Sequence, residues 1–165
     1  LSTGLKAELI REESIKKLVD TMAKLNKYAF EASIGLDVSA STDVTGFGLL
    51  GHAREMAGKE NRVTILIDSQ KLPLLPEART MAQDGMLPGG CYRNRGFVGD
   101  RVQFDEGVPL ALSDLMFDPQ TSGGLLLAMP EKDATTYLST MHEQGERAWV
   151  IGRVKAFEGV AIKVH

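Results

Sequence analysis

An acidic residue directly before a glycine-rich turn is the clearest sign of chemistry in this sequence. Residues 41–52 read Ser-Thr-Asp-Val-Thr-Gly-Phe-Gly-Leu-Leu-Gly-His. Gly46 and Gly48 allow a backbone to approach a ligand closely, and the apolar residues after them recur at helical spacing. The start of a helix attracts anions, and the carboxylate of Asp43 can hold Mg²⁺, which binds phosphate oxygens. The segment therefore predicts one corner of a phosphate–metal site, with Asp43 as the metal ligand.

A second polar segment, residues 117–124, reads Phe-Asp-Pro-Gln-Thr-Ser-Gly-Gly. Asp-Pro and Ser-Gly-Gly are common in turns, so the residues alone favour a simple turn. The alternative is a polar loop that lines a cleft beside the first motif. Its lining side chains would be Asp118, Gln120, Thr121 and Ser122.

The other reactive side chains form no recognisable catalytic constellation. Cys91 has no histidine near it in the sequence, which favours a structural thiol. His52, His142 and His165 lack the spacing of metal ligands, and we expect His52 to have a packing or capping role. The sequence has no Walker-type glycine loop with a following lysine. We therefore predict no catalytic residue in this chain, and its cofactor-binding residues stay unknown.

Composition describes an ordinary globular chain. Its 165 residues suffice for one domain with a core, and 43% of them are apolar and 25% charged. The net charge of −3 gives no sign of nucleic-acid binding, and no apolar run is long enough to span a membrane. A single cysteine excludes an internal disulfide framework and fits a reducing cytosol, so we expect a cytoplasmic protein. Because Leu1 is neither an initiator methionine nor the start of a signal peptide, we expect the chain to begin partway through a larger protein.

Apolar spacing predicts most of the regular elements. A helix is expected over 12–26, from a stripe that includes Leu18 and Met22, and a shorter helix over 28–34. A strand over 36–44 would deliver Asp43 to its end. The remaining elements are helices over 46–57, 76–83 and 130–144 and strands over 62–68, 125–129, 148–157 and 160–165.

Glycine content predicts an irregular segment over residues 85–107, because seven glycines and prolines interrupt it. Within it, Arg93 and Asn94 are expected to be exposed and to face water. The last two strands are close in sequence and predict a C-terminal hairpin. The alternation of helices and strands predicts an α+β domain in which helices pack on a mixed sheet.

Three segments resemble the signatures of the selenophosphate synthetases, also called selenide, water dikinases. They are residues 42–52, Pro88-Gly89-Gly90 followed by Arg93 and Asn94, and residues 118–126. Their order and separation match, so the resemblance covers essentially the whole chain. Related enzymes such as aminoimidazole ribonucleotide synthetase, and a hydrogenase maturation protein, tend to carry a different residue where Phe47 stands.

The resemblance implies an enzyme that makes selenophosphate, AMP and phosphate from ATP, selenide and water with Mg²⁺. It implies that residues 1–165 are a single C-terminal domain with a three-layer α/β/α fold, like that of the aminoimidazole ribonucleotide synthetase superfamily. The implied partners are the N-terminal ATP-binding domain and a second copy in a homodimer, with no nucleic acid and no membrane. Asp43 matches a metal-ligating aspartate of the family. Cys91 does not match its catalytic cysteine, which belongs to the N-terminal half, so the isolated chain is expected to be inactive.

Two alternatives stay open. One is a stand-alone binding module that kept the fold without catalysis. The other is a sister ATP-dependent enzyme that makes a different small phosphorylated product.

Overall fold

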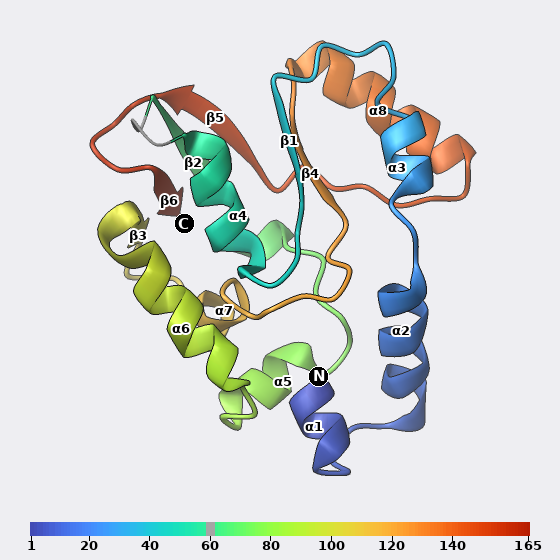
Figure 1. Ribbon diagram of the computed structural model, residues 1–165, viewed down its shortest axis with the longest axis vertical. Helices are drawn as coiled ribbons and strands as arrows, with labels where there is room; N and C mark the ends of the chain where they lie inside the picture. The colour runs from blue at the N-terminus through green and yellow to red at the C-terminus, as the bar shows by residue number, and fades with distance from the viewer. Residues whose placement is uncertain (59–61) are drawn as a thin grey trace.

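The computed structural model describes residues 1–58 and 62–165, which form eight α-helices and six strands (Figure 1). The helices are α1 Ser2–Lys6, α2 Glu12–Ala23, α3 Lys27–Glu31, α4 Gly48–Ala57, α5 Ala78–Gln83, α6 Gly89–Val98, α7 Leu110–Leu115 and α8 Glu131–Glu143. The strands are β1 Ala40–Asp43, β2 Val63–Ile67, β3 Val102–Phe104, β4 Leu125–Ala128, β5 Gly152–Ala156 and β6 Ile162–Val164. Two short 3₁₀ turns, Ser69–Lys71 and Gly99–Arg101, complete the set. In this described part of the chain, no helix combines the length and the apolar character needed to cross a bilayer.

The strands form two sheets. The larger sheet has the order β3-β6-β2-β5, in which β6 runs parallel to both neighbours and β5 runs antiparallel to β2. The smaller sheet is an antiparallel ribbon of β1 and β4, in which Asp43 lies opposite Leu125. The predicted α+β class and the mixed sheet are confirmed.

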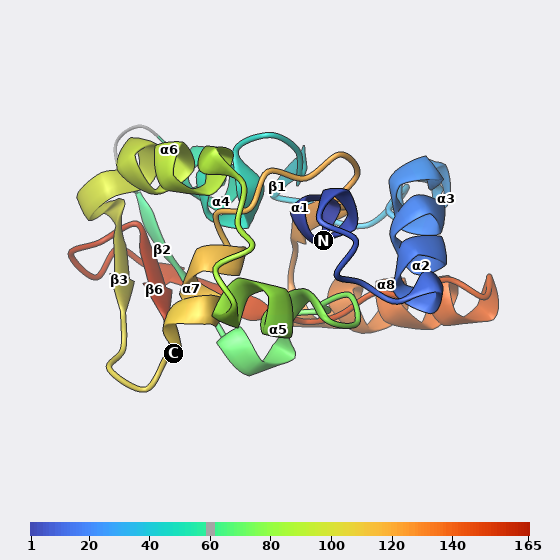
Figure 2. The ribbon, with the colours of Figure 1, turned by 90° about the horizontal axis from the view of Figure 1, so that it is seen from below.

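The main core lies between α4, the end of α7 and the four-stranded sheet. Leu50 of α4, Ile162 of β6 and Phe117 after α7 are almost wholly buried in it. Burial of each such side chain stabilises the fold by about 1.5–3 kcal/mol. Adjacent residues of β4 face opposite ways, so Leu126 packs against this core, whereas Leu127 contacts the cluster that contains Tyr137 of α8. Helices therefore cover both faces of the β1–β4 ribbon (Figure 2).

The prediction of an irregular segment over 85–107 is wrong, because α6 and β3 lie within it. Cys91, Asn94 and Val98 recur at helical spacing and form the buried face of α6. A Cβ on Gly90 would come within 2.5 Å of the ring of Pro119. Glycine weakens a helix by about 1 kcal/mol, but here close packing requires it, and tertiary contacts outweigh the local propensity.

The predicted C-terminal hairpin is also wrong, because β2 lies between β5 and β6 in the sheet. Ile162 and Val164 are fully buried, which places β6 at the centre of the sheet, whereas every residue of β5 is exposed at its edge. The strand expected over 148–157 begins only at Gly152, where a Cβ would come within 2.0 Å of the carbonyl oxygen of Leu66. The predicted helices over 12–26, 46–57, 76–83 and 130–144 are confirmed as α2, α4, α5 and α8.

Candidate functional site

The two polar motifs lie side by side although about 75 residues separate them. Beyond the β1–β4 pairing, the Val44 N–H donates to the carbonyl of Gly124, and the Gly123 N–H donates to that of Val44, each at 2.9 Å. The Gln120 N–H donates to the carbonyl of Thr45 at 3.0 Å. Segment 118–124 therefore lies beside the first motif, as the alternative interpretation required, and the cleft that its side chains would line stays a prediction.

Gly48 makes a close backbone approach to the second motif. Its φ is +70°, and a Cβ there would lie 2.8 Å from the carbonyl carbon of Phe117. The Leu50 N–H, in the first turn of α4, donates to the carbonyl of Met116 at 3.1 Å. The expectation that Gly48 lets a ligand approach closely is therefore wrong, because the backbone of Phe117 occupies that space. A Cβ on Gly46, by contrast, would meet no atom within 4 Å.

Asn94 joins the two motifs, which corrects the expectation that it faces water. Its side chain is 8% exposed, and its amide nitrogen donates to the carbonyl of Gly46 at 2.8 Å and to that of Phe117 at 2.9 Å. Arg93, the neighbouring residue on α6, is exposed as predicted. The helical spacing of Asn94 with Cys91 was the sequence signal that could have placed Asn94 inside.

Arg95 is a contributor to the site that the sequence analysis missed. Its Nη2 donates to Ser113 Oγ at 2.6 Å and to Asp114 Oδ1 at 2.5 Å, which ties α6 to α7. Its guanidinium group lies 4.6 Å from the ring centre of Phe117. Arg95 therefore fixes the residue that immediately precedes the second polar loop.

Cys91 and Asp118 form a partly buried contact, in which the thiol donates to Oδ1 at 3.5 Å. Burial, reinforced by the negative charge of Asp118, raises the pKa of Cys91 to about 12. Burial also raises the pKa of Asp118, although Gln120 Nε2 donates to its Oδ2 at 3.0 Å. A thiol that stays protonated is a poor nucleophile, which agrees with the structural interpretation of Cys91.

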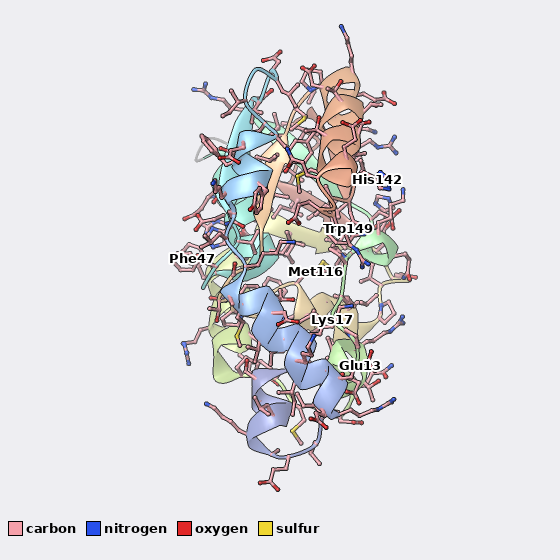
Figure 3. The ribbon with its side chains drawn as sticks, turned by 90° about the vertical axis from the view of Figure 1, so that its right-hand side faces the viewer. Glu13, Lys17, Phe47, Met116, His142 and Trp149 are labelled. Carbon is pink, nitrogen blue, oxygen red and sulfur yellow. The ribbon has the colours of Figure 1, made fainter. Side chains whose placement is uncertain are left out.

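The histidines do not form a metal site. His52 is buried, with Nε2 3.2 Å from Thr45 Oγ1 and Nδ1 3.2 Å from Glu55 Oε2, so its expected packing role is confirmed. His142 is remote from the first motif, because it and Phe47 of that motif lie on opposite sides of the molecule (Figure 3). Within residues 1–58 and 62–165, no three histidine, cysteine, aspartate or glutamate side chains group to hold a metal ion.

Asp43 lies at the end of β1, exposed, on the rim of an open groove of about 570 Å³. We call this hollow the α3 groove. Its polar lining residues are Ser33, Ser41, Thr42 and Asp43, and its apolar ones are Phe30, Ile34, Leu36, Val38, Leu125 and Leu127. The strand register explains part of this lining, because the pairs Ser41–Leu127 and Asp43–Leu125 share one face of the ribbon.

The rim of the α3 groove offers one carboxylate that could hold a cation. Asp43 has an accessible carboxylate on the same face of the ribbon as Ser41, and carboxylate oxygens are the hard ligands that Mg²⁺ prefers. Mg²⁺ takes six oxygen ligands, so water, phosphate or another polypeptide would have to provide the rest.

Comparison with protein families matches residues 2–165 to the family described as "AIR synthase related protein, C-terminal domain". A selenide, water dikinase of Clostridium botulinum (strain Eklund 17B) is 43% identical over 154 residues, which are 93% of this chain and 44% of that protein. Selenide, water dikinase 2 of Peptoclostridium acidaminophilum is 43% identical over 165 residues, which are 99% of this chain and 47% of that protein. The chain therefore spans less than half the length of these curated relatives.

Among solved structures, the hydrogenase maturation protein HypE superposes on 81% of this chain and 34% of its own. The TM-score is 0.48 and the sequence identity is 20%.

Proposed function

This chain belongs to the AIR synthase related protein family as a C-terminal domain, and we propose that it is the C-terminal half of a selenide, water dikinase. The observation that carries the proposal is the 43% identity to two such enzymes over 93% and 99% of the chain. The full-length protein would convert ATP, selenide and water into selenophosphate, AMP and phosphate. Residues 1–165 would be one domain, and an N-terminal domain would bind most of the ATP.

In this proposal the full-length enzyme uses Mg²⁺, pairs as a homodimer and acts in the cytoplasm. Phosphoryl transfer depends mainly on positioning and on neutralising phosphate charge, and Mg²⁺ supplies that charge neutralisation. Asp43 would hold the ion through its carboxylate. Its exposure on the groove rim supports this role, because a cation and a phosphate can both reach it.

The other motif residues would position Asp43 rather than contact substrate. Asn94 and Gly48 hold the first motif against the second, immediately after the strand that ends at Asp43. The loop from Asp118 to Ser122 would then border the cleft between the two domains. The Gln120 N–H, which donates to the carbonyl of Thr45, holds this loop against the first motif.

Substitution of Asp43 in the full-length protein tests the proposal. Asp43→Asn removes the charge that holds the cation and should lower selenide-dependent AMP formation by about 100-fold or more, with the fold unchanged by circular dichroism. Asp20→Asn is the matched control, because Asp20 is an exposed carboxylate on α2 with only an ion pair to Lys16 at 3.5 Å. If Asp43→Asn keeps its activity, Asp43 is not a ligand. If the unmodified protein forms no AMP with selenide, the function itself is refuted.

The isolated chain should have no kinase activity and should bind Mg-ATP weakly or not at all, because one carboxylate is too few ligands. Titration calorimetry measures this directly, and tight binding would contradict it. The family also includes enzymes related to AIR synthase, so a sister ATP-dependent enzyme is the second candidate. Turnover of the full-length protein with an aminoimidazole precursor, but not with selenide, would favour that candidate.

A further inference from the structure

A second pocket, of about 450 Å³, lies where the chain leaves α8. Leu138 and His142 line it from the helix, and Glu146, Arg147, Ala148 and Trp149 line it from the segment that follows. We call it the Trp149 pocket. His142 and Trp149 lie on the side of the molecule away from Phe47 (Figure 3). Its volume is within the range of pockets that hold small ligands.

The backbone of the Trp149 pocket is fixed at both ends. Helix α8 ends in a Schellman turn, in which the Glu146 N–H donates to the carbonyl of Met141 at 2.8 Å. Beyond the pocket, the carbonyl of Ile151 accepts from the Asp68 N–H at 2.9 Å. Between these points, Ala148 packs against the smaller buried cluster. The pocket wall is therefore held in place before any ligand arrives.

The charges of the Trp149 pocket favour an anion. Glu146 forms an ion pair with Lys24, which neutralises the carboxylate. Arg147 is exposed, and within residues 1–58 and 62–165 its guanidinium has no acidic partner. The pocket is thus left with one uncompensated positive charge, and a guanidinium binds a carboxylate or a phosphate through paired hydrogen bonds.

The indole of Trp149 provides a surface for a planar ring. Trp149 is 50% exposed although it is the largest apolar side chain of the pocket. Aromatic rings stack favourably on an indole, with a benefit beyond the area that they bury. The imidazole of His142, across the pocket on α8, offers a further ring N–H to a polar group of the ligand.

We propose that the Trp149 pocket binds a small planar aromatic anion, whose ring stacks on Trp149 and whose carboxylate or phosphate pairs with Arg147. None of the lining residues belongs to either polar motif, so this role is independent of the proposed function. Aromatic carboxylates and nucleoside monophosphates share the required chemistry.

Fluorine NMR of the full-length protein labelled with 5-fluorotryptophan tests the site. Trp149 is the only tryptophan of this sequence, and its signal is the one that Trp149→Phe removes. The probes are 1-naphthoate and AMP. Two matched compounds each lack one feature, since 1-naphthamide has no charge and decahydro-1-naphthoate has no planar ring.

We expect 1-naphthoate or AMP to shift the Trp149 signal with saturation at a Kd of about 1 mM or less. The two matched compounds should bind about tenfold or more weakly than 1-naphthoate, if it is the tighter probe. Arg147→Gln should weaken the tighter probe by about tenfold, because a charge-assisted hydrogen bond is lost. Arg79→Gln is the control, since Arg79 is exposed on α5 and should leave the affinity unchanged.

Tighter binding of 1-naphthoate would assign the pocket to aromatic carboxylates, and tighter binding of AMP would assign it to nucleotides. A Trp149 signal that does not move with either probe, or that moves without saturation up to about 10 mM, would overturn the site. Equal affinity for 1-naphthoate and 1-naphthamide would overturn the role of Arg147, as would equal effects of Arg147→Gln and Arg79→Gln. The comparison of the compounds needs no variant, so it decides the matter even if Arg147→Gln lowers the yield of folded protein.

Discussion

Removal of the Asn94 amide should destabilise the isolated chain more than any exposed change on the same helix. Asn94→Ala deletes the donors to Gly46 and Phe117, at 2.8 and 2.9 Å, from a side chain that is 8% exposed. Each hydrogen bond contributes about 1 kcal/mol, and a buried carbonyl left without a partner costs about 1–3 kcal/mol. Because water can reach part of the site, we expect a loss of about 2–4 kcal/mol in the free energy of unfolding.

Asn94→Asp keeps the shape but turns the donor into an anionic acceptor that faces two carbonyl oxygens. A buried charge without a partner costs about 3–5 kcal/mol, so this variant should be the less stable of the two at neutral pH. Burial should raise the pKa of the introduced carboxyl above its unfolded value. The variant should therefore be most stable below the unfolded pKa, near 4, and should lose stability as the pH rises toward 7.

Urea unfolding followed by circular dichroism at about pH 4 and pH 7 measures both effects. Arg93→Ala is the control, because Arg93 is exposed on the same helix and its loss should change stability by less than about 0.5 kcal/mol. If Asn94→Ala costs no more than this control, Asn94 does not hold the two motifs together. If Asn94→Asp matches the unmodified chain at neutral pH, the donor geometry described above is wrong.

Further predictions concern the two glycines of the first motif, the Cys91 thiol and the partly buried carboxyl of Asp118. Gly48→Ala should cost about 2–4 kcal/mol, because its φ is +70° and the new Cβ would lie 2.8 Å from the backbone of Phe117. Gly46→Ala, whose Cβ meets nothing within 4 Å, should cost less than about 1 kcal/mol, and thermal unfolding compares the two. The thiol of Cys91, with a pKa of about 12, should resist an aromatic disulfide in the native chain at about pH 8 and react after unfolding; a fast native reaction would contradict its burial. Because burial raises the pKa of Asp118, the stability that its protonated form contributes is lost as the pH rises through that pKa. Asp118→Asn should reduce this loss between about pH 4 and pH 7, and an unchanged pH profile by urea unfolding would refute the shift.

The helices could be predicted from sequence where an apolar stripe repeats over several turns. Helix α8 and helix α4 are such cases, and their observed limits lie within a few residues of those expected. Helix α6 could not be predicted in this way, because the benefit of Gly90 lies in its contact with Pro119, about 30 residues later. Local propensity cannot report a contact that forms only when distant segments meet.

The candidate site was predicted in part. The position of Asp43 at a strand end follows from its neighbours in sequence, and its exposure agrees with a ligand role. Asn94 and Arg95 were missed, because both act on carbonyl groups or side chains of other elements. The predicted C-terminal hairpin is wrong, because strands that are close in sequence need not pair. Burial of Ile162 instead favours a central position for β6 in the sheet.

The central place of β6 has a consequence for biosynthesis. Strands β2 and β3 leave the ribosome well before β6. They do not pair with each other, because β6 lies between them in the sheet, and each can pair with β6 only after it emerges. Until Ile162–Val164 emerges, the edges of β2 and β3 that pair with β6 lack hydrogen-bonding partners, and chaperones or premature association can act on them. Such non-local pairing also predicts slow closure of the sheet, so the nascent chain should stay sensitive to proteases until β6 is made.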